Sequence, residues 1–141
     1  MSSRELDRLI RKVPQEREAF RRFFEILESN TSTQPKYVTV NRLFDKLEPN
    51  SVYGLTQVIT ALLEAGLLEQ VIRIQSPKTG GVIRDFNSIV EIPSTIHDKY
   101  SDSEIDVTPE NMGVFYRLPT KQETSSHKWI IWNISKNSKK S

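Results

Sequence analysis

Hydrophobic residues recur at helical spacing through the N-terminal part of the chain. In residues 14–28 the apolar positions fall at i, i+3, i+4 and i+7, which puts them on one helix face: Phe20, Phe23, Phe24 and Leu27. Residues 3–12 carry a second apolar face that includes Leu6 and Leu9. Proline disrupts a helix interior but is tolerated in a first turn. The pattern therefore predicts two helices that are separated at Pro14.

Shorter elements follow in the middle of the chain. Residues 37–40, YVTV, form a β-prone run, and Asn41 is a suitable N-cap for a short helix over residues 42–47. Ser51 is a suitable N-cap for a longer helix over residues 52–65. These segments predict a strand, a short helix and a longer helix in that order.

A β-hairpin is predicted directly after the longer helix. Gly66 suits the position that ends a helix, because glycine adopts the left-handed conformation without strain. Residues 67–74 and 82–92 are two β-prone runs, and the turn sequence SPKTGG joins them. The second strand is therefore expected to reach Ile92.

This order of elements resembles the winged helix-turn-helix superfamily over roughly residues 14–93. The most similar stretch is TALLEAGLLEQVIRI, in which a helix ends at Gly66 while Leu67 and Leu68 enter a strand. The resemblance implies an α+β fold: a winged helix, which is a three-helix bundle with a β-hairpin wing, plus a C-terminal β-containing extension. Residues 1–93 would form the winged-helix domain with an N-terminal helical extension.

The rest of the chain departs from this simple pattern. Residues 94–134 combine an acidic stretch, HDKYSDSEIDVTPE, expected to be a solvated linker, with two expected strands that pack on the same domain, GVFYRLP and KWIIWNI. Strict alternation leaves both faces of KWIIWNI apolar, and this strand carries Trp129 and Trp132. Residues 135–141, SKNSKKS, are expected to be a disordered basic tail.

Composition narrows the class of protein only moderately. The 141 residues are 36% hydrophobic and 27% charged, with a net charge of +2, which is too mild to indicate a polyanionic partner. The lack of cysteine excludes disulfides and thiolate metal sites. No apolar run approaches the ~20 residues of a membrane helix, and the N-terminus has no signal-peptide pattern. We therefore expect a cytoplasmic or nucleoid protein without membrane contact.

Motifs for catalysis are missing from the sequence. His97 and His127 are far apart, and neither has a metal-ligand spacing. The SPKTGG turn lacks the residue order of a phosphate-binding loop and precedes a strand. The acidic DSEID lacks the glycine and the final glutamate of a calcium loop. We expect a non-catalytic protein without a cofactor or a metal.

The resemblance implies that residues 52–65 form a recognition helix, which in this superfamily enters the major groove of DNA. Helical spacing puts Tyr53, Gln57 and Thr60 on its outer face, where such polar side chains can contact bases or phosphates. The same spacing directs an apolar set to the core: Val52, Leu55, Ile59, Leu62 and Leu63.

Contacts with phosphate would have to come from outside this helix, because it contains no Lys or Arg. Candidate side chains lie on the hairpin and on the preceding short helix. The set consists of Arg42, Arg73, Lys78, Thr79 and Arg84.

Two functions remain open at this point. The first is a DNA-binding protein, such as a transcriptional regulator, that binds double-stranded DNA as a homodimer. The alternative is a protein–protein adaptor with Trp129 and Trp132 at the partner interface, since Trp is enriched at interface anchors. The basic tip at Lys78 favours DNA, whereas the cation-free helix and the near-balanced charge favour the adaptor.

Overall fold

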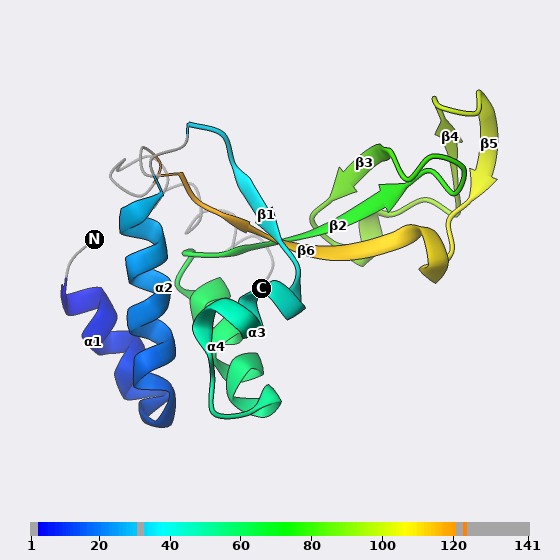
Figure 1. Ribbon diagram of the computed structural model, residues 1–141. Helices are drawn as coiled ribbons and strands as arrows, with labels where there is room; N and C mark the ends of the chain where they lie inside the picture. The colour runs from blue at the N-terminus through cyan, green and yellow to red at the C-terminus, as the bar shows by residue number, and fades with distance from the viewer. Residues whose placement is uncertain (1–2, 31–32, 121–122, 124–141) are drawn as a thin grey trace. The chain divides into compact units, whose positions relative to one another are not determined.

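The computed structural model of the chain describes residues 3–30, 33–120 and 123 (Figure 1). Its helices and antiparallel strands confirm the α+β class. The chain forms two compact units, one made of Met1–Glu69 with Arg117–Ser141 and the other of Gln70–Tyr116. The expected domain boundary at residue 93 lies inside the second unit. Trp129, Trp132 and the expected basic tail lie outside the described residues.

The first unit is mainly helical (Figure 1). Its elements are α1 (Ser3–Lys12), the 3-10 helix η1 (Pro14–Glu16), α2 (Arg17–Ser29), β1 (Lys36–Val38), α3 (Val40–Leu47) and α4 (Val52–Glu64). The interruption at Pro14 confirms the predicted separation of the first two helices. Helix α2 packs against α1 and α3, and its predicted apolar face is buried: Phe20, Phe23, Phe24 and Leu27.

Helix α3 begins two residues earlier than its sequence predicts. Asn41 is not the N-cap, because Thr39 has the extended backbone of a cap and its Oγ1 accepts a hydrogen bond of 3.2 Å from Arg42 N. The preceding strand accordingly ends at Val38. Both Thr and Asn are good caps, so residue type alone does not choose between these positions.

Helix α4 begins at the predicted residue, and it ends at Glu64, one residue before the predicted end at Ala65. The Ser51 Oγ accepts a hydrogen bond of 2.9 Å from Gly54 N at the start. At the other end Gly66 has a φ of 74°, and Leu67 N donates to the carbonyl oxygen of Leu62 at 2.9 Å. Together with the bond from Gly66 N to Leu63 O at 3.1 Å, this is a Schellman motif.

The predicted hairpin is present in the second unit, but its second strand is shorter than expected. Strands β2 (Glu69–Gln75) and β3 (Val82–Phe86) are antiparallel, with Ile72 opposite Phe86. Beyond Phe86 the chain forms the 3-10 helix η2 (Ile89–Glu91) instead of continuing as a strand to Ile92. The Ser88 Oγ accepts a hydrogen bond from Val90 N at 3.4 Å, and such local bonds compete with strand pairing.

A second hairpin occupies the stretch that was expected to be a linker. Strands β4 (Thr95–Asp98) and β5 (Ser103–Asp106) pair antiparallel, with Ile96 opposite Ile105. His97 therefore lies in a strand and not in a loop. The alternation of single isoleucines with polar residues is a half-buried strand pattern, and the many acids of this stretch obscured it.

The last described strand confirms the prediction for GVFYRLP. After the 3-10 helix η3 (Pro109–Asn111), strand β6 spans Met112–Leu118. The strand order of the four-stranded sheet is β1-β6-β2-β3, and β4-β5 form a separate sheet. Within the described residues, none of the helices has the length and apolar character needed to cross a membrane.

Candidate functional site

The outer face of α4 carries the three residues predicted to contact bases. Tyr53 is 72% exposed, Thr60 is exposed and Gln57 is half-buried. The Thr60 hydroxyl donates a hydrogen bond of 2.8 Å to the carbonyl oxygen of Thr56. The Gln57 Oε1 accepts one of 3.0 Å from Gln15 Nε2. Two of the three side chains thus already have hydrogen-bond partners within the first unit.

The first turn of α4 exposes an apolar side chain that was expected in the core. Val52 is 71% exposed, whereas Leu55 and Ile59 are buried as predicted. Val52 lies on the predicted inner side of the helix but at its first residue, where it lacks a preceding turn to pack against. It therefore forms, with Tyr53, an exposed pair of large side chains at the start of the helix.

A buried carboxylate fixes the start of α4. Glu16 is 2% exposed, and its two carboxylate oxygens accept hydrogen bonds of 2.8 and 3.0 Å from Asn50 N. Asn50 Nδ2 in turn donates to the carbonyl oxygen of Gln15 at 2.6 Å. A Cβ at residue 54 would overlap the Glu16 carboxylate, so a larger residue there requires this hydrogen-bonded carboxylate to move. The exposed pair is therefore held on a firmly anchored turn.

Two of the predicted phosphate-binding arginines make contacts inside the hairpin. Arg73 forms a double hydrogen bond with Asp85, from Nε to Oδ1 at 2.9 Å and from Nη2 to Oδ2 at 3.1 Å. Its guanidinium also lies 4.9 Å from the centre of the Phe115 ring. Arg84 stacks on the ring of Phe86 at 4.9 Å. These contacts give Arg73, whose side chain is only 17% exposed, a structural role in the sheet.

The tip of the β2–β3 hairpin remains exposed at Lys78 and Thr79. Ser76 Oγ accepts hydrogen bonds from the backbone N–H groups of both residues, at 3.3 and 3.4 Å. The same hydroxyl donates to Asp98 Oδ2 at 2.7 Å. The tip is therefore supported by a residue of the neighbouring hairpin.

Asp98 is fully buried and joins the two hairpins. Its Oδ1 accepts a hydrogen bond from Tyr100 N at 2.9 Å, and the Tyr100 hydroxyl donates to the carbonyl oxygen of Val82 at 3.2 Å. Burial raises the pKa of Asp98, but hydrogen bonds from Ser76, Tyr100 and Ser101 outweigh it and hold the pKa below its ordinary value. The carboxylate form is thus the one that this site stabilises.

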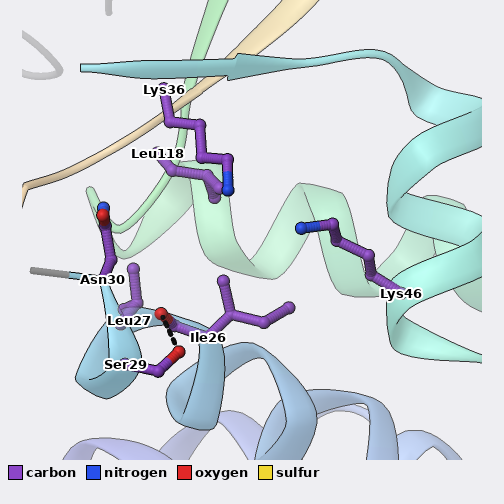
Figure 2. Close-up of a pocket in the computed structure, with 7 residues that line it drawn as sticks. All are labelled: Ile26, Leu27, Ser29, Asn30, Lys36, Lys46 and Leu118. Carbon is purple, nitrogen blue, oxygen red and sulfur yellow. Dashed lines mark hydrogen bonds between the residues drawn. The ribbon is translucent and has the colours of Figure 1, made fainter. Parts of the chain in front are cut away.

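A pocket of about 250 Å³ opens in the first unit beside β1 and α3 (Figure 2). The Lys36 and Lys46 side chains reach toward the same space, and Ile26, Leu27 and Leu118 form an apolar wall. No sequence motif indicates this pocket, because its residues come from four separate elements.

The electrostatics of the pocket are dominated by cations. Burial lowers the pKa of Lys46, and the nearby positive charges of Lys36 and Arg42 lower it further. Arg42, which the sequence predicts to contact DNA, is exposed on α3 and lies close enough to Lys46 to lower its pKa. Bringing like charges together favours the neutral form of a lysine unless an anion is bound.

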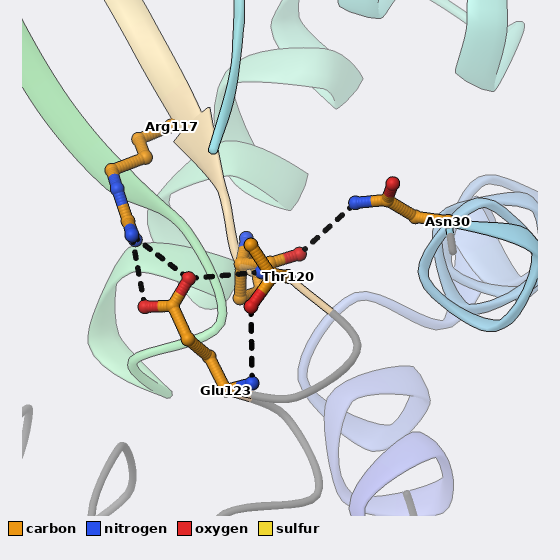
Figure 3. A network of polar contacts seen from close by, with 5 residues as sticks. Asn30, Arg117, Thr120 and Glu123 are labelled. Atoms are coloured by element: carbon orange, nitrogen blue, oxygen red, sulfur yellow. Dashed lines mark hydrogen bonds and ion pairs between the residues drawn. The ribbon is translucent and has the colours of Figure 1, made fainter. Parts of the chain in front are cut away.

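A polar network follows strand β6 (Figure 3). Arg117 Nη2 donates to both carboxylate oxygens of Glu123, at 2.8 and 2.9 Å. Thr120 and Glu123 exchange hydrogen bonds: Thr120 N donates to Oε1 at 3.0 Å, and Glu123 N donates to Thr120 Oγ1 at 3.1 Å. Asn30 Nδ2 donates to the carbonyl oxygen of Pro119 at 3.4 Å. The T-x-x-E spacing of residues 120–123 is a sequence signature of this reciprocal exchange of hydrogen bonds.

His97 lies between two acidic side chains on the second hairpin. Its Nε2 is 3.2 Å from Asp102 Oδ1, and its Nδ1 is 3.4 Å from Glu104 Oε1. Over residues 3–30, 33–120 and 123, no group of three or more His, Asp or Glu side chains is arranged to hold a metal ion.

The predicted residues divide between the two units. Tyr53, Gln57, Thr60 and Arg42 belong to the first, whereas Arg73, Lys78, Thr79 and Arg84 belong to the second. The chain has no match among protein-family models, and neither curated proteins nor solved structures give a significant match.

Proposed function

We propose that the chain is a non-catalytic module of the winged-helix type that docks on a partner protein through the first turn of α4. The main observation behind this proposal is the exposure of Val52 and Tyr53, which are 71% and 72% exposed. Tyrosine is enriched at protein interfaces. Covering both side chains would remove apolar surface from water.

The order of elements supports the winged-helix type. Two helices joined by a short turn, α3 and α4, are followed directly by the antiparallel hairpin of β2 and β3. This is the sequence of elements in a helix-turn-helix with a wing. In that arrangement α4 has the place of the recognition helix.

The chemistry of α4 favours protein over DNA as its partner. The helix contains no Lys or Arg, so it contributes no positive charge to phosphate binding. Thr60 and Gln57 already form hydrogen bonds with Thr56 and Gln15. The side chains most available for new contacts are Val52 and Tyr53.

Photo-crosslinking in cells tests this proposal. A photoreactive phenylalanine analogue replaces Tyr53 in one variant and Tyr100 in a matched control, because Tyr100 is also exposed, at 47%, but lies in the second unit. We expect a discrete protein adduct from position 53 that disappears when Val52→Asp is added. An adduct with a second copy of the chain would show that the partner is the chain itself, in a homodimer. No adduct at 53, or an equal one at 100, contradicts docking through α4.

A second candidate function is double-stranded DNA binding. It is supported by the exposed tip at Lys78 and Thr79, whose backbone N–H groups donate to Ser76 Oγ. Lysine and threonine side chains both contact phosphates, and a cytoplasmic or nucleoid location would suit this function. Fluorescence anisotropy with a labelled duplex at low salt tests it. A lack of binding that persists at high protein concentration contradicts it.

A further inference from the structure

The pocket beside β1 and α3 contains two lysines, Lys36 and Lys46, that form no ion pair with any carboxylate among the described residues. Both side chains reach into the same space from different elements (Figure 2). An anion placed between them would reduce the repulsion between the two lysines.

The pocket is also lined by three apolar side chains. Ile26 and Leu27 come from α2, and Leu118 comes from the end of β6. A bare inorganic anion would leave this wall in contact with water, whereas a ligand with a hydrocarbon part would cover it. The pocket therefore combines recognition of charge with recognition of an apolar group.

The polar side chains at the rim have partners of their own. The Ser29 hydroxyl donates to the carbonyl oxygen of Ile26 at 3.1 Å, and Asn30 Nδ2 donates to the carbonyl oxygen of Pro119. The two ammonium groups are thus the donors best placed to hold a ligand. A volume of about 250 Å³ is just below the range of roughly 300–1,000 Å³ that is usual for ligand pockets. This size suits a small molecule and not a peptide.

We propose that this pocket binds a small amphipathic anion, with its carboxylate between Lys36 and Lys46 and its hydrocarbon part against Ile26, Leu27 and Leu118. This site is separate from the docking turn of α4 and does not depend on the proposed function. Burial and neighbouring positive charges lower the pKa of Lys46. A carboxylate bound beside it would offset these effects and stabilise the charged lysine.

Titrations of the full chain with hexanoate, acetate, inorganic phosphate and hexanol test the proposal. We expect saturable hexanoate binding by calorimetry, with NMR shifts at the Lys36 and Lys46 amides. Hexanoate should bind at least about tenfold more tightly than acetate, because its added methylene groups lie against the apolar wall. Hexanol should bind at least about tenfold more weakly than hexanoate, because it lacks the charge. Equal binding of phosphate and hexanoate, or no saturable binding, overturns the proposal.

Variants locate the site. Lys36→Met and Lys46→Met should each weaken hexanoate binding by about tenfold or more, whereas Lys78→Met, an exposed lysine of the second unit, should leave it unchanged. Ile26→Ala should weaken hexanoate and leave acetate unchanged. Melting curves establish that each variant is folded. Folded lysine variants that bind hexanoate like the original chain overturn the assignment.

Discussion

The buried carboxylate of Glu16 limits the space available at residue 54. It accepts the hydrogen bonds from Asn50 N, and it occupies the space that a side chain at residue 54 would need. Alanine is favoured over glycine in helix interiors on propensity alone. At Gly54 the steric conflict should outweigh that preference, so the usual effect of this substitution should be reversed.

Gly54→Ala should therefore destabilise the protein by about 1–3 kcal/mol, the usual cost of overpacking a site. Urea unfolding gives this value. The control is a double-mutant cycle with Glu16→Ala, in which the carboxylate is absent and the added methyl group has room. Strictly additive effects of the two substitutions would show that the conflict is not between these residues.

Asp98 makes a residue-scale prediction about pH. Its folded-state pKa lies below the ordinary value near 3.9, so the unfolded chain takes up the proton more readily as the pH falls. The stabilisation from Asp98 is thus fully present above about pH 4 and is lost as the pH falls through the folded-state pKa. Asp98→Asn should lower the melting temperature at neutral pH, and the difference from the original chain should narrow in acid.

Thermal melts from pH 7 down to pH 2.5 measure this effect. The matched control is Asp102→Asn, because the side chain of Asp102 is 93% exposed and contacts only His97 among the ion pairs of the second hairpin. It should change the melting temperature little at any pH. A gap between Asp98→Asn and the original chain that stays constant down to pH 2.5 would contradict the lowered pKa.

At the scale of elements, the sequence predicts a helix end correctly where a single residue near that end is strongly favoured there. Pro14 ends α1, Ser51 caps α4 and Gly66 terminates it, as the sequence predicts. The sequence does not distinguish Thr39 from Asn41 as the N-cap of α3, because both are suitable caps. The choice depends on where β1 ends, and strand pairing decides that.

The second hairpin and the pocket are not predictable from such local sequence signals. Strands β4 and β5 contain many acids, and their pairing is visible only once Ile96 lies opposite Ile105. Lys36 of β1 and Lys46 of α3 line the same pocket and interact electrostatically, and α3 packs against α2. Such proximity depends on tertiary packing, which no spacing along the chain encodes.

The network after β6 gives an element-scale prediction. Arg117→Lys should destabilise the first unit by about 1–2 kcal/mol, because the shorter lysine cannot place its ammonium nitrogen where Arg117 Nη2 donates to both oxygens of Glu123. Arg21→Lys is the matched control, since Arg21 forms an exposed pair with Glu18, and exposed pairs contribute little. Chemical denaturation compares the two. An equal effect of both substitutions would show that the double contact with Glu123 is not important.

At the scale of the whole molecule, charge limits what the chain can do with DNA. The net charge is only +2, and the basic hairpin residues are partly committed to internal contacts: Arg73 to Asp85, and Arg84 to the Phe86 ring. The affinity of a protein for duplex DNA falls with salt in proportion to the number of phosphates it neutralises. A chain with few available cations on its wing should therefore show a shallow dependence on salt.

If the chain binds duplex DNA, the slope of log K against log salt should be small, and Lys78→Ala should reduce it by about 0.9, the contribution of one phosphate contact. Arg73→Lys should leave the slope unchanged, because the Arg73 side chain is paired with Asp85, although it should lower stability. Anisotropy titrations at several salt concentrations measure both. A steep slope that Lys78→Ala does not alter would place the DNA contact away from the hairpin tip, and it would remove the observation that favours DNA over a protein partner.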